Sequence, residues 1–94
     1  MTFEIPKASI DSYLQRRFQD LDKFKEALTK KDADVFMKIG HQIKGNGVTF
    51  GFPGLSDLGM KMEQAASAHS YEKLQALVSE YETQIQAAKK KLES

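Results

Sequence analysis

The chain has no cysteine and only two prolines, and each shortage removes a class of structure. Without cysteine, disulfide bridges, thiolate zinc sites and cysteine catalysis are excluded for these 94 residues, and the reducing cytoplasm is the expected location. The prolines stand at positions 6 and 53, so most of the chain is free of the strongest helix breaker. Side-chain packing alone must therefore stabilise the fold.

Charge of one sign and long apolar runs are lacking as well. Fourteen Lys and Arg residues against thirteen Asp and Glu residues give a net charge of +1, too weak a field to hold a polyanion such as nucleic acid. No apolar run approaches the ~20 residues that span a bilayer, and the N-terminal MTFEIPKAS lacks the basic and apolar regions of a signal peptide. We therefore expect neither a nucleic-acid nor a membrane partner, and one domain spanning residues 1–94.

The residues that are abundant favour helix. Ala, Leu, Glu, Lys and Gln are frequent, and apolar side chains recur every three or four positions in four segments. The expected helices cover Ser9–Lys30, residues 33–50, Leu55–Ala68 and residues 71–92, with a break at Gly51–Gly54. Because short connections join them, the sequence predicts an all-α fold, an antiparallel up-and-down four-helix bundle.

Each expected helix carries one apolar face that we assign to the core. The fourth has the most regular heptad pattern, and Gly59 in the third would permit close approach of a neighbouring helix. The expected core residues are Ile10, Leu14, Leu21, Phe24, Leu28, Phe36, Ile39, Ile43, Gly47, Phe50, Leu55, Leu58, Met62, Ala66, Tyr71, Leu74, Val78, Tyr81, Ile85, Ala88 and Leu92.

One segment, HQIKGNGVTFGF at residues 41–52, contradicts the helical composition around it, because it is rich in glycine. Each glycine inside a helix costs roughly 0.5–1 kcal/mol relative to alanine. Access is the simplest physical reason to keep Gly45 there: a glycine one turn from His41 removes a side chain that would otherwise block a partner from the imidazole.

His41 is the expected reactive residue of this segment. At ~100° per residue it lies more than a quarter-turn from the centre of the core face, so it should face water. An exposed imidazole is mostly neutral at pH 7 and offers one nucleophilic ring nitrogen. Lys44, on the next turn, can offset the negative charge of a phosphoryl group, and Gly45 leaves room for the group and its donor.

A docking surface is expected around this histidine. Met37 and Val48 border the same outward face, and Gly47 and Phe52 complete the candidate set. No catalytic triad, metal cluster or phosphate-cradling glycine loop accompanies His41. We therefore expect a phosphoryl carrier rather than an enzyme, without a cofactor or metal of its own.

The run HQIKGNGVTFGFPGLSDLGMKMEQA resembles the signature of histidine-containing phosphotransfer (HPt) domains, H-x-(L/I)-K-G-x-(G/S/A) followed by a leucine-rich helix that ends in Glu. The positions that match are His41, Ile43, Lys44, Gly45, Gly47, Gly51, Leu55, Leu58 and Glu63. At Asn46 the chain departs from the family, in which serine or another small residue is common. Asn46 should point off the His41 face, with little effect there, and Glu63 is interpreted as structural rather than as a partner of the second ring nitrogen.

The resemblance implies a function in a two-component phosphorelay. His41 would accept a phosphoryl group from the aspartyl phosphate of a response-regulator receiver domain and pass it to another receiver, and a (hybrid) histidine kinase would complete the relay. The receiver would supply Mg²⁺ and the acidic pocket. The chain would be a free-standing, monomeric module.

Two other interpretations remain open at this point. The protein could be an interaction module that binds and inhibits a receiver or kinase without carrying phosphate, or a structural bundle in which the glycines are helix-packing contacts. His69, near an expected helix boundary, is assigned no function. The lysines at residues 89–91 are assigned to a solvated helix end, where they meet the negative end of the dipole.

Overall fold

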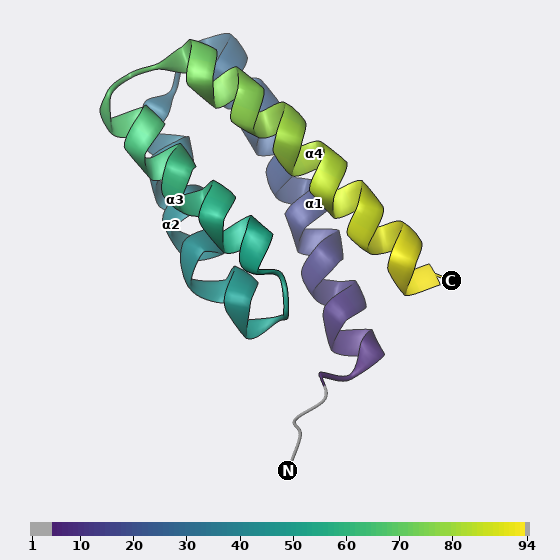
Figure 1. The fold of residues 1–94 in the computed structure, drawn as a ribbon. Helices are drawn as coiled ribbons and strands as arrows, with labels where there is room; N and C mark the ends of the chain where they lie inside the picture. The colour runs from purple at the N-terminus through teal and green to yellow at the C-terminus, as the bar shows by residue number, and fades with distance from the viewer. Residues whose placement is uncertain (1–4, 94) are drawn as a thin grey trace.

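Four helices make up the structure, a computed structural model that describes residues 5–93. They are α1 (Lys7–Lys30), α2 (Ala33–Thr49), α3 (Pro53–Ser67) and α4 (Tyr71–Glu93). Successive helices run in opposite directions, and both ends of the described chain lie at the same end of the bundle (Figure 1). The predicted all-α, up-and-down four-helix bundle is therefore confirmed.

Two helix starts differ from the sequence prediction, and proline explains both. Helix α1 begins at Lys7 because Pro6 takes the N-cap position, and its carbonyl accepts hydrogen bonds from the amides of Ser9 (3.0 Å) and Ile10 (3.1 Å). Ser9 is therefore inside the helix and not its cap. Pro53, expected in the break, is instead the first residue of α3, where the missing amide hydrogen costs nothing.

The apolar faces of the four helices meet in a single core. Two phenylalanines from neighbouring helices, Phe24 and Phe36, stack with their ring centroids 5.0 Å apart, and Tyr81 meets Phe24 edge-on at 5.3 Å. The Tyr81 hydroxyl donates a hydrogen bond to the carbonyl of Arg17 at 2.9 Å, so α4 is also joined to α1 by a polar contact. Core packing and this bond together fix α1 against α4.

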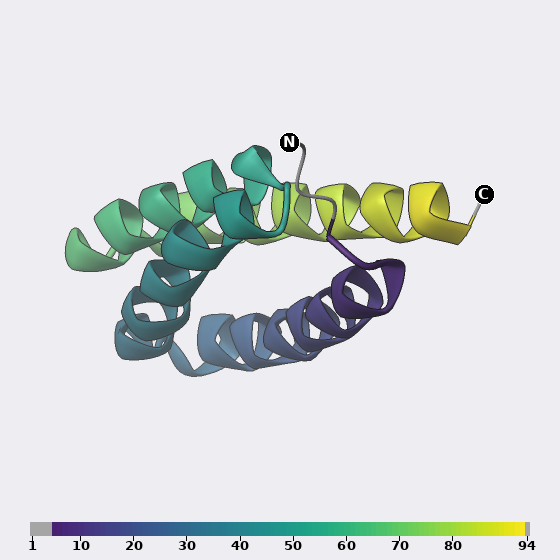
Figure 2. The same ribbon diagram turned by 90° about the horizontal axis from the view of Figure 1, so that it is seen from below.

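Some expected core residues are only partly buried because α1 and α4 extend beyond the α2–α3 turn, as the view from below shows (Figure 2). At this open end Ile10, Phe50, Ala88 and Leu92 line a shallow groove together with Phe52. The predicted apolar faces are correct, but the outermost turn of each long helix has no opposite helix to cover it.

Helices α2 and α3 form the closest pair, since their backbones touch at glycines. A Cβ on Gly40 would stand 2.9 Å from the carbonyl oxygen of Gly59, and a Cβ on Gly47 would stand 2.5 Å from the hydroxyl of Ser56. That hydroxyl accepts a hydrogen bond from the Val48 amide at 2.7 Å. These contacts set the register of the hairpin, with position 40 beside position 59 and position 47 beside position 56.

At the other end of the bundle the two connecting turns are joined. The hydroxyl of Tyr71 donates a 2.7 Å hydrogen bond to the carbonyl of Lys31. Lys31 (φ 54°) and His69 (φ 53°) both adopt the left-handed conformation that favours glycine. His69 is exposed and belongs to a helix-ending turn, which agrees with assigning it no function.

Candidate functional site

His41 stands on the outer face of α2, and 74% of its side chain is exposed. Gly45 follows one turn later on the same face, and beyond the adjacent backbone of α2 no atom lies within 4 Å of the position a Cβ would take there. The expected arrangement, an imidazole in solvent beside bare backbone, is present. A partner can therefore approach the ring from outside the bundle.

Glu63 of α3 is the polar neighbour of the ring. Its Oε2 lies 3.3 Å from His41 Nδ1, and its side chain is 27% exposed. The purely structural interpretation of Glu63 from the sequence was therefore wrong. The close packing of Gly40 explains the contact: a Cβ on Gly40 would stand 2.9 Å from the Gly59 carbonyl oxygen and 3.5 Å from the Glu63 amide nitrogen, so Glu63 lies beside the neighbouring position 41.

This contact assigns different roles to the two ring nitrogens. An ionised carboxylate only accepts hydrogen bonds, so it favours the tautomer in which Nδ1 carries the hydrogen. Nε2 then keeps its lone pair and points away from Glu63. The result is a nucleophilic nitrogen exposed to solvent and a carboxylate placed to stabilise positive charge on the ring.

Lys44 supplies a cation beside the histidine. It is exposed on the turn that follows His41, and within residues 5–93 its ammonium group forms no ion pair. An unpaired ammonium group is available to an incoming anion without first losing a carboxylate partner. Lys44 therefore keeps the position that the sequence predicts.

The exposed apolar surface near His41 differs from the expected docking set. Met37 (41% exposed) and Val48 (62%) are exposed as expected, and Met60 of α3 (37%), one turn before Glu63, is exposed as well. Sequence reasoning missed Met60 because only the α2–α3 register brings it to this face. The surface formed by Met37, Val48 and Met60 is called the apolar rim below.

Two residues of the expected docking set are not on this rim. Gly47 is buried against Ser56 of α3, where it permits close helix packing. Phe52 is half-buried and stacks on the Tyr13 ring at 5.9 Å, so it contributes to the bundle more than to an outer face. The burial of Gly47 agrees with its assignment to the core face of α2 and contradicts its place in the docking set. Phe52 departs from the docking set because its contact with Tyr13 of α1 was not visible in the sequence pattern.

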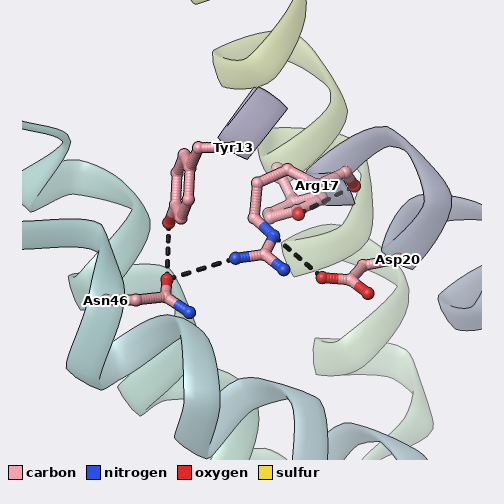
Figure 3. A network of polar contacts seen from close by, with 5 residues as sticks. Tyr13, Arg17, Asp20 and Asn46 are labelled. Carbon is pink, nitrogen blue, oxygen red and sulfur yellow. Dashed lines mark hydrogen bonds and ion pairs between the residues drawn. The ribbon is translucent and has the colours of Figure 1, made fainter. Parts of the chain in front are cut away.

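Asn46 joins α2 to α1, and its side chain points toward Tyr13 and Arg17 (Figure 3). Its Oδ1 accepts hydrogen bonds from the Tyr13 hydroxyl (2.6 Å) and from Arg17 Nη1 (3.3 Å). Arg17 Nε lies 2.9 Å from Asp20 Oδ2, and both of these side chains are buried. Asn46 is therefore the acceptor for two α1 donors, a role that the sequence did not indicate.

Burial shifts the ionisation of this network. Desolvation raises the pKa of the Asp20 carboxyl above its ordinary value, although the charge of Arg17 acts in the opposite direction. Desolvation also raises the pKa of the Tyr13 phenol. The network thus holds an ion pair away from water between α1 and α2, on a different side of α2 from His41.

Within residues 5–93, no group of three or more His, Asp or Glu side chains is placed to hold a metal ion. None of the four helices is both long enough and apolar enough to cross a membrane. The chemistry that the site offers is therefore that of the imidazole, the carboxylate and the nearby lysine.

These features define a class: a small four-helix module that presents one exposed histidine on its second helix. The Hpt domain family matches the chain over residues 9–91, and the protein belongs to this family. Comparisons with curated proteins and with solved structures give no significant match. Hpt domains are phosphotransfer carriers in two-component phosphorelay signalling, so response regulators and kinases are its partners as a class.

Proposed function

We propose that His41 is the phosphoacceptor of a phosphorelay intermediate, which takes a phosphoryl group from a receiver-domain aspartyl phosphate and passes it to another receiver. The observation that carries the proposal is the exposed ring with Nδ1 on Glu63 and the open position of Gly45 beside it. Nε2 is then the nucleophilic nitrogen, on a side chain that is 74% exposed.

The transfer step balances without a further reactant. The Nε2 lone pair forms a P–N bond, the acyl P–O bond breaks, and the aspartate leaves with the electron pair. The ring then carries a positive charge and retains its hydrogen on Nδ1. Glu63 Oε2, 3.3 Å from Nδ1, stabilises that charge, and the return of the phosphoryl group to an aspartate is the reverse step.

Two further residues assist the proposed transfer. Lys44 offsets the negative charge of the phosphoryl oxygens as a mobile ammonium group. Gly45 leaves space for the receiver's acidic pocket to approach, because any side chain there would project from the same outer face. Mg²⁺ and the catalytic acids belong to the receiver in this proposal.

The partner docks on the apolar rim around His41. Met37, Val48 and Met60 offer the partner three exposed apolar side chains on α2 and α3. We place the module in the cytoplasm as a monomer, with a (hybrid) histidine kinase at the start of the relay.

The test uses purified receiver domains from the host, each phosphorylated with radiolabelled acetyl phosphate in the presence of Mg²⁺. Mixing with the protein should move acid-labile, alkali-stable label onto it. His41→Gln should receive no label, whereas His69→Gln, the matched control, should be labelled normally.

Label that remains on His41→Gln would contradict the proposal. If no receiver labels the wild-type chain, yet the chain still inhibits a receiver or kinase and His41→Gln inhibits equally well, the protein is instead a binding module that carries no phosphate. Both measurements use the same set of purified domains.

A further inference from the structure

Two lysines flank His41 on the outer face of α2. Lys44 follows the histidine by three residues and Lys38 precedes it by three, so each lies ~60° from His41 around the helix, on opposite sides. Residues at this spacing are neighbours, with Cβ atoms about 5–6 Å apart. Both lysines are exposed, so either ammonium group can reach the space above the ring.

The direction of helical side chains brings the ring toward Lys38. Each Cα–Cβ bond tilts toward the N-terminus of the helix, so a side chain covers the turn before its own Cα. The His41 ring therefore lies over the turn that carries Lys38, while Lys44 leans back toward the ring from the following turn. A group bonded to Nε2 lies between the two.

Lys38 is available for this contact. Within residues 5–93 it forms no ion pair, even with Asp34, which precedes it at the favourable spacing of four residues. By contrast, Lys25, Lys30 and Lys61 each pair with a carboxylate.

None of the carboxylates that line the groove between α1 and α2 pairs with Lys38, which borders this groove, in the part of the chain that the structure describes. Two acids that line this groove, Asp20 and Glu26, are each paired with a cation of α1. Asp32, the third, lies more than 4 Å from every ammonium group that the structure describes. Lys38 therefore remains free to turn toward an anion on His41.

We infer that Lys38 is a second cation for the phosphoryl group on His41, so that two ammonium groups bracket a dianion. The inference rests on the proposed function, because it concerns the same phosphoryl group. Lys38 binds the phosphoryl oxygens and takes no part in proton transfer. The chain thus holds its phosphoryl group by one more charge than the single lysine of the family signature provides.

The test is a ³¹P NMR titration of the phosphorylated protein. Potassium phosphoramidate phosphorylates His41 chemically, in a His69→Gln background that leaves one histidine, so no receiver is required. The second ionisation of the phosphoryl group is then followed in wild type, Lys38→Gln, Lys44→Gln and the double variant. Lys73→Gln, on α4, is the control for loss of one charge elsewhere.

Removal of a cation at about 7 Å should raise the pKa of the phosphoryl group by roughly 0.2–0.4 units. Lys38→Gln and Lys44→Gln should each show this rise, the double variant about their sum, and Lys73→Gln none. The shifts should shrink as salt is added. A change in fold stability alone would not raise the pKa of the phosphoryl group in proportion to the number of lysine charges removed.

If the Lys38→Gln titration coincides with that of wild type while Lys44→Gln shifts, the inference is overturned and the proposed function stands. If Lys73→Gln shifts as much as Lys38→Gln, the effect is one of net charge and the inference is overturned as well. Failure of transfer from receivers, measured separately, would overturn the proposed function even where the titration shows both lysines near the phosphoryl group.

Discussion

Gly59 lies against Gly40 so closely that a Cβ on Gly59 would stand 2.5 Å from the Gly40 carbonyl oxygen. The backbones of α2 and α3 are therefore in contact at this point, and the register that results brings Glu63 to His41. Two kinds of glycine can thus be distinguished in these helices: Gly40, Gly47 and Gly59 are required by helix packing, whereas Gly45 faces solvent.

Alanine at these two kinds of glycine should have opposite effects on stability. Gly59→Ala forces a Cβ into backbone, so we expect a loss of ~1–3 kcal/mol or more in the free energy of unfolding. Gly45→Ala meets no atom within 4 Å beyond the adjacent backbone of α2 and should gain about 0.5–1 kcal/mol from helix propensity, yet slow transfer by crowding the ring. Urea denaturation and transfer rates measure the two effects. Faster or unchanged transfer by Gly45→Ala would count against the access argument.

Glu63 should control the tautomer of His41. Glu63→Gln keeps the shape of the side chain but removes its charge, so the Nδ1–H tautomer should become less populated and transfer should slow about fivefold, the loss of roughly 1 kcal/mol from a charge-assisted hydrogen bond. The ¹⁵N chemical shifts of the two ring nitrogens report the tautomer directly. Glu72→Gln, an exposed carboxylate on α4, is the control. Identical ring shifts in wild type and Glu63→Gln would reject this role.

The buried Arg17–Asp20 pair should respond differently to single and double replacement. Asp20→Leu alone leaves the Arg17 guanidinium buried without its carboxylate, and we expect a loss of about 3–5 kcal/mol. Arg17→Met combined with Asp20→Leu removes both charges and should range from neutral to about 1–4 kcal/mol more stable than wild type. A double-mutant cycle in urea measures the coupling. Additive single losses in the double variant would show that the pair is not coupled.

The Arg17–Asp20 pair also makes the free energy of unfolding depend on pH, in a direction that the pKa of Asp20 determines. Burial raises the pKa of the Asp20 carboxyl above its ordinary value of 3.8, so the folded state binds this proton more tightly than the unfolded state does. Ionisation of Asp20 therefore disfavours folding at pH 7 relative to its protonated form, and this cost is relieved as pH falls through the raised pKa toward 3.8. The stability difference between the double variant and wild type should accordingly be largest at neutral pH and smaller near pH 4.

Glycine at the two left-handed turn residues should stabilise the bundle. Lys31 (φ 54°) and His69 (φ 53°) hold a conformation that costs a non-glycine residue roughly 1–2 kcal/mol. We expect Lys31→Gly and His69→Gly each to gain about 1 kcal/mol in thermal unfolding, with phosphotransfer unchanged. A loss of stability in both would show that their side-chain contacts outweigh the backbone cost.

Much of the fold follows from the local sequence pattern, and the features that this pattern did not predict have physical causes. Apolar spacing of three and four residues located all four helices, because a helix face that must be buried repeats at that period. The starts of α1 and α3 were predicted two residues too late, because Pro6 and Pro53 begin helices here although proline also breaks helices. The partial burial of Phe50 and Leu92 could not be predicted, since it depends on unequal helix lengths.

For the site, the outward direction of His41 followed from the geometry of α2 alone. The positions of Glu63 and Met60 relative to His41 depend on the register between α2 and α3, which two glycines and Ser56 determine. Gly40 and Gly59, two glycines that allow close helix packing, are the sequence signal that could have indicated this register. Nothing in the pattern of either helix marked Asn46 as an acceptor for side chains of α1.

Asn46 limits how freely its segment can be transplanted. Residues 41–52 carry the His41 signature, but their asparagine is matched to a tyrosine and an arginine at positions 13 and 17 of a different helix. A chimaera that grafts this segment onto another four-helix scaffold would bring the Asn46 amide without its two donors. Replacement of the segment in this protein would remove the acceptor that Tyr13 and Arg17 share. Exchange of α1 and α2 together would preserve both.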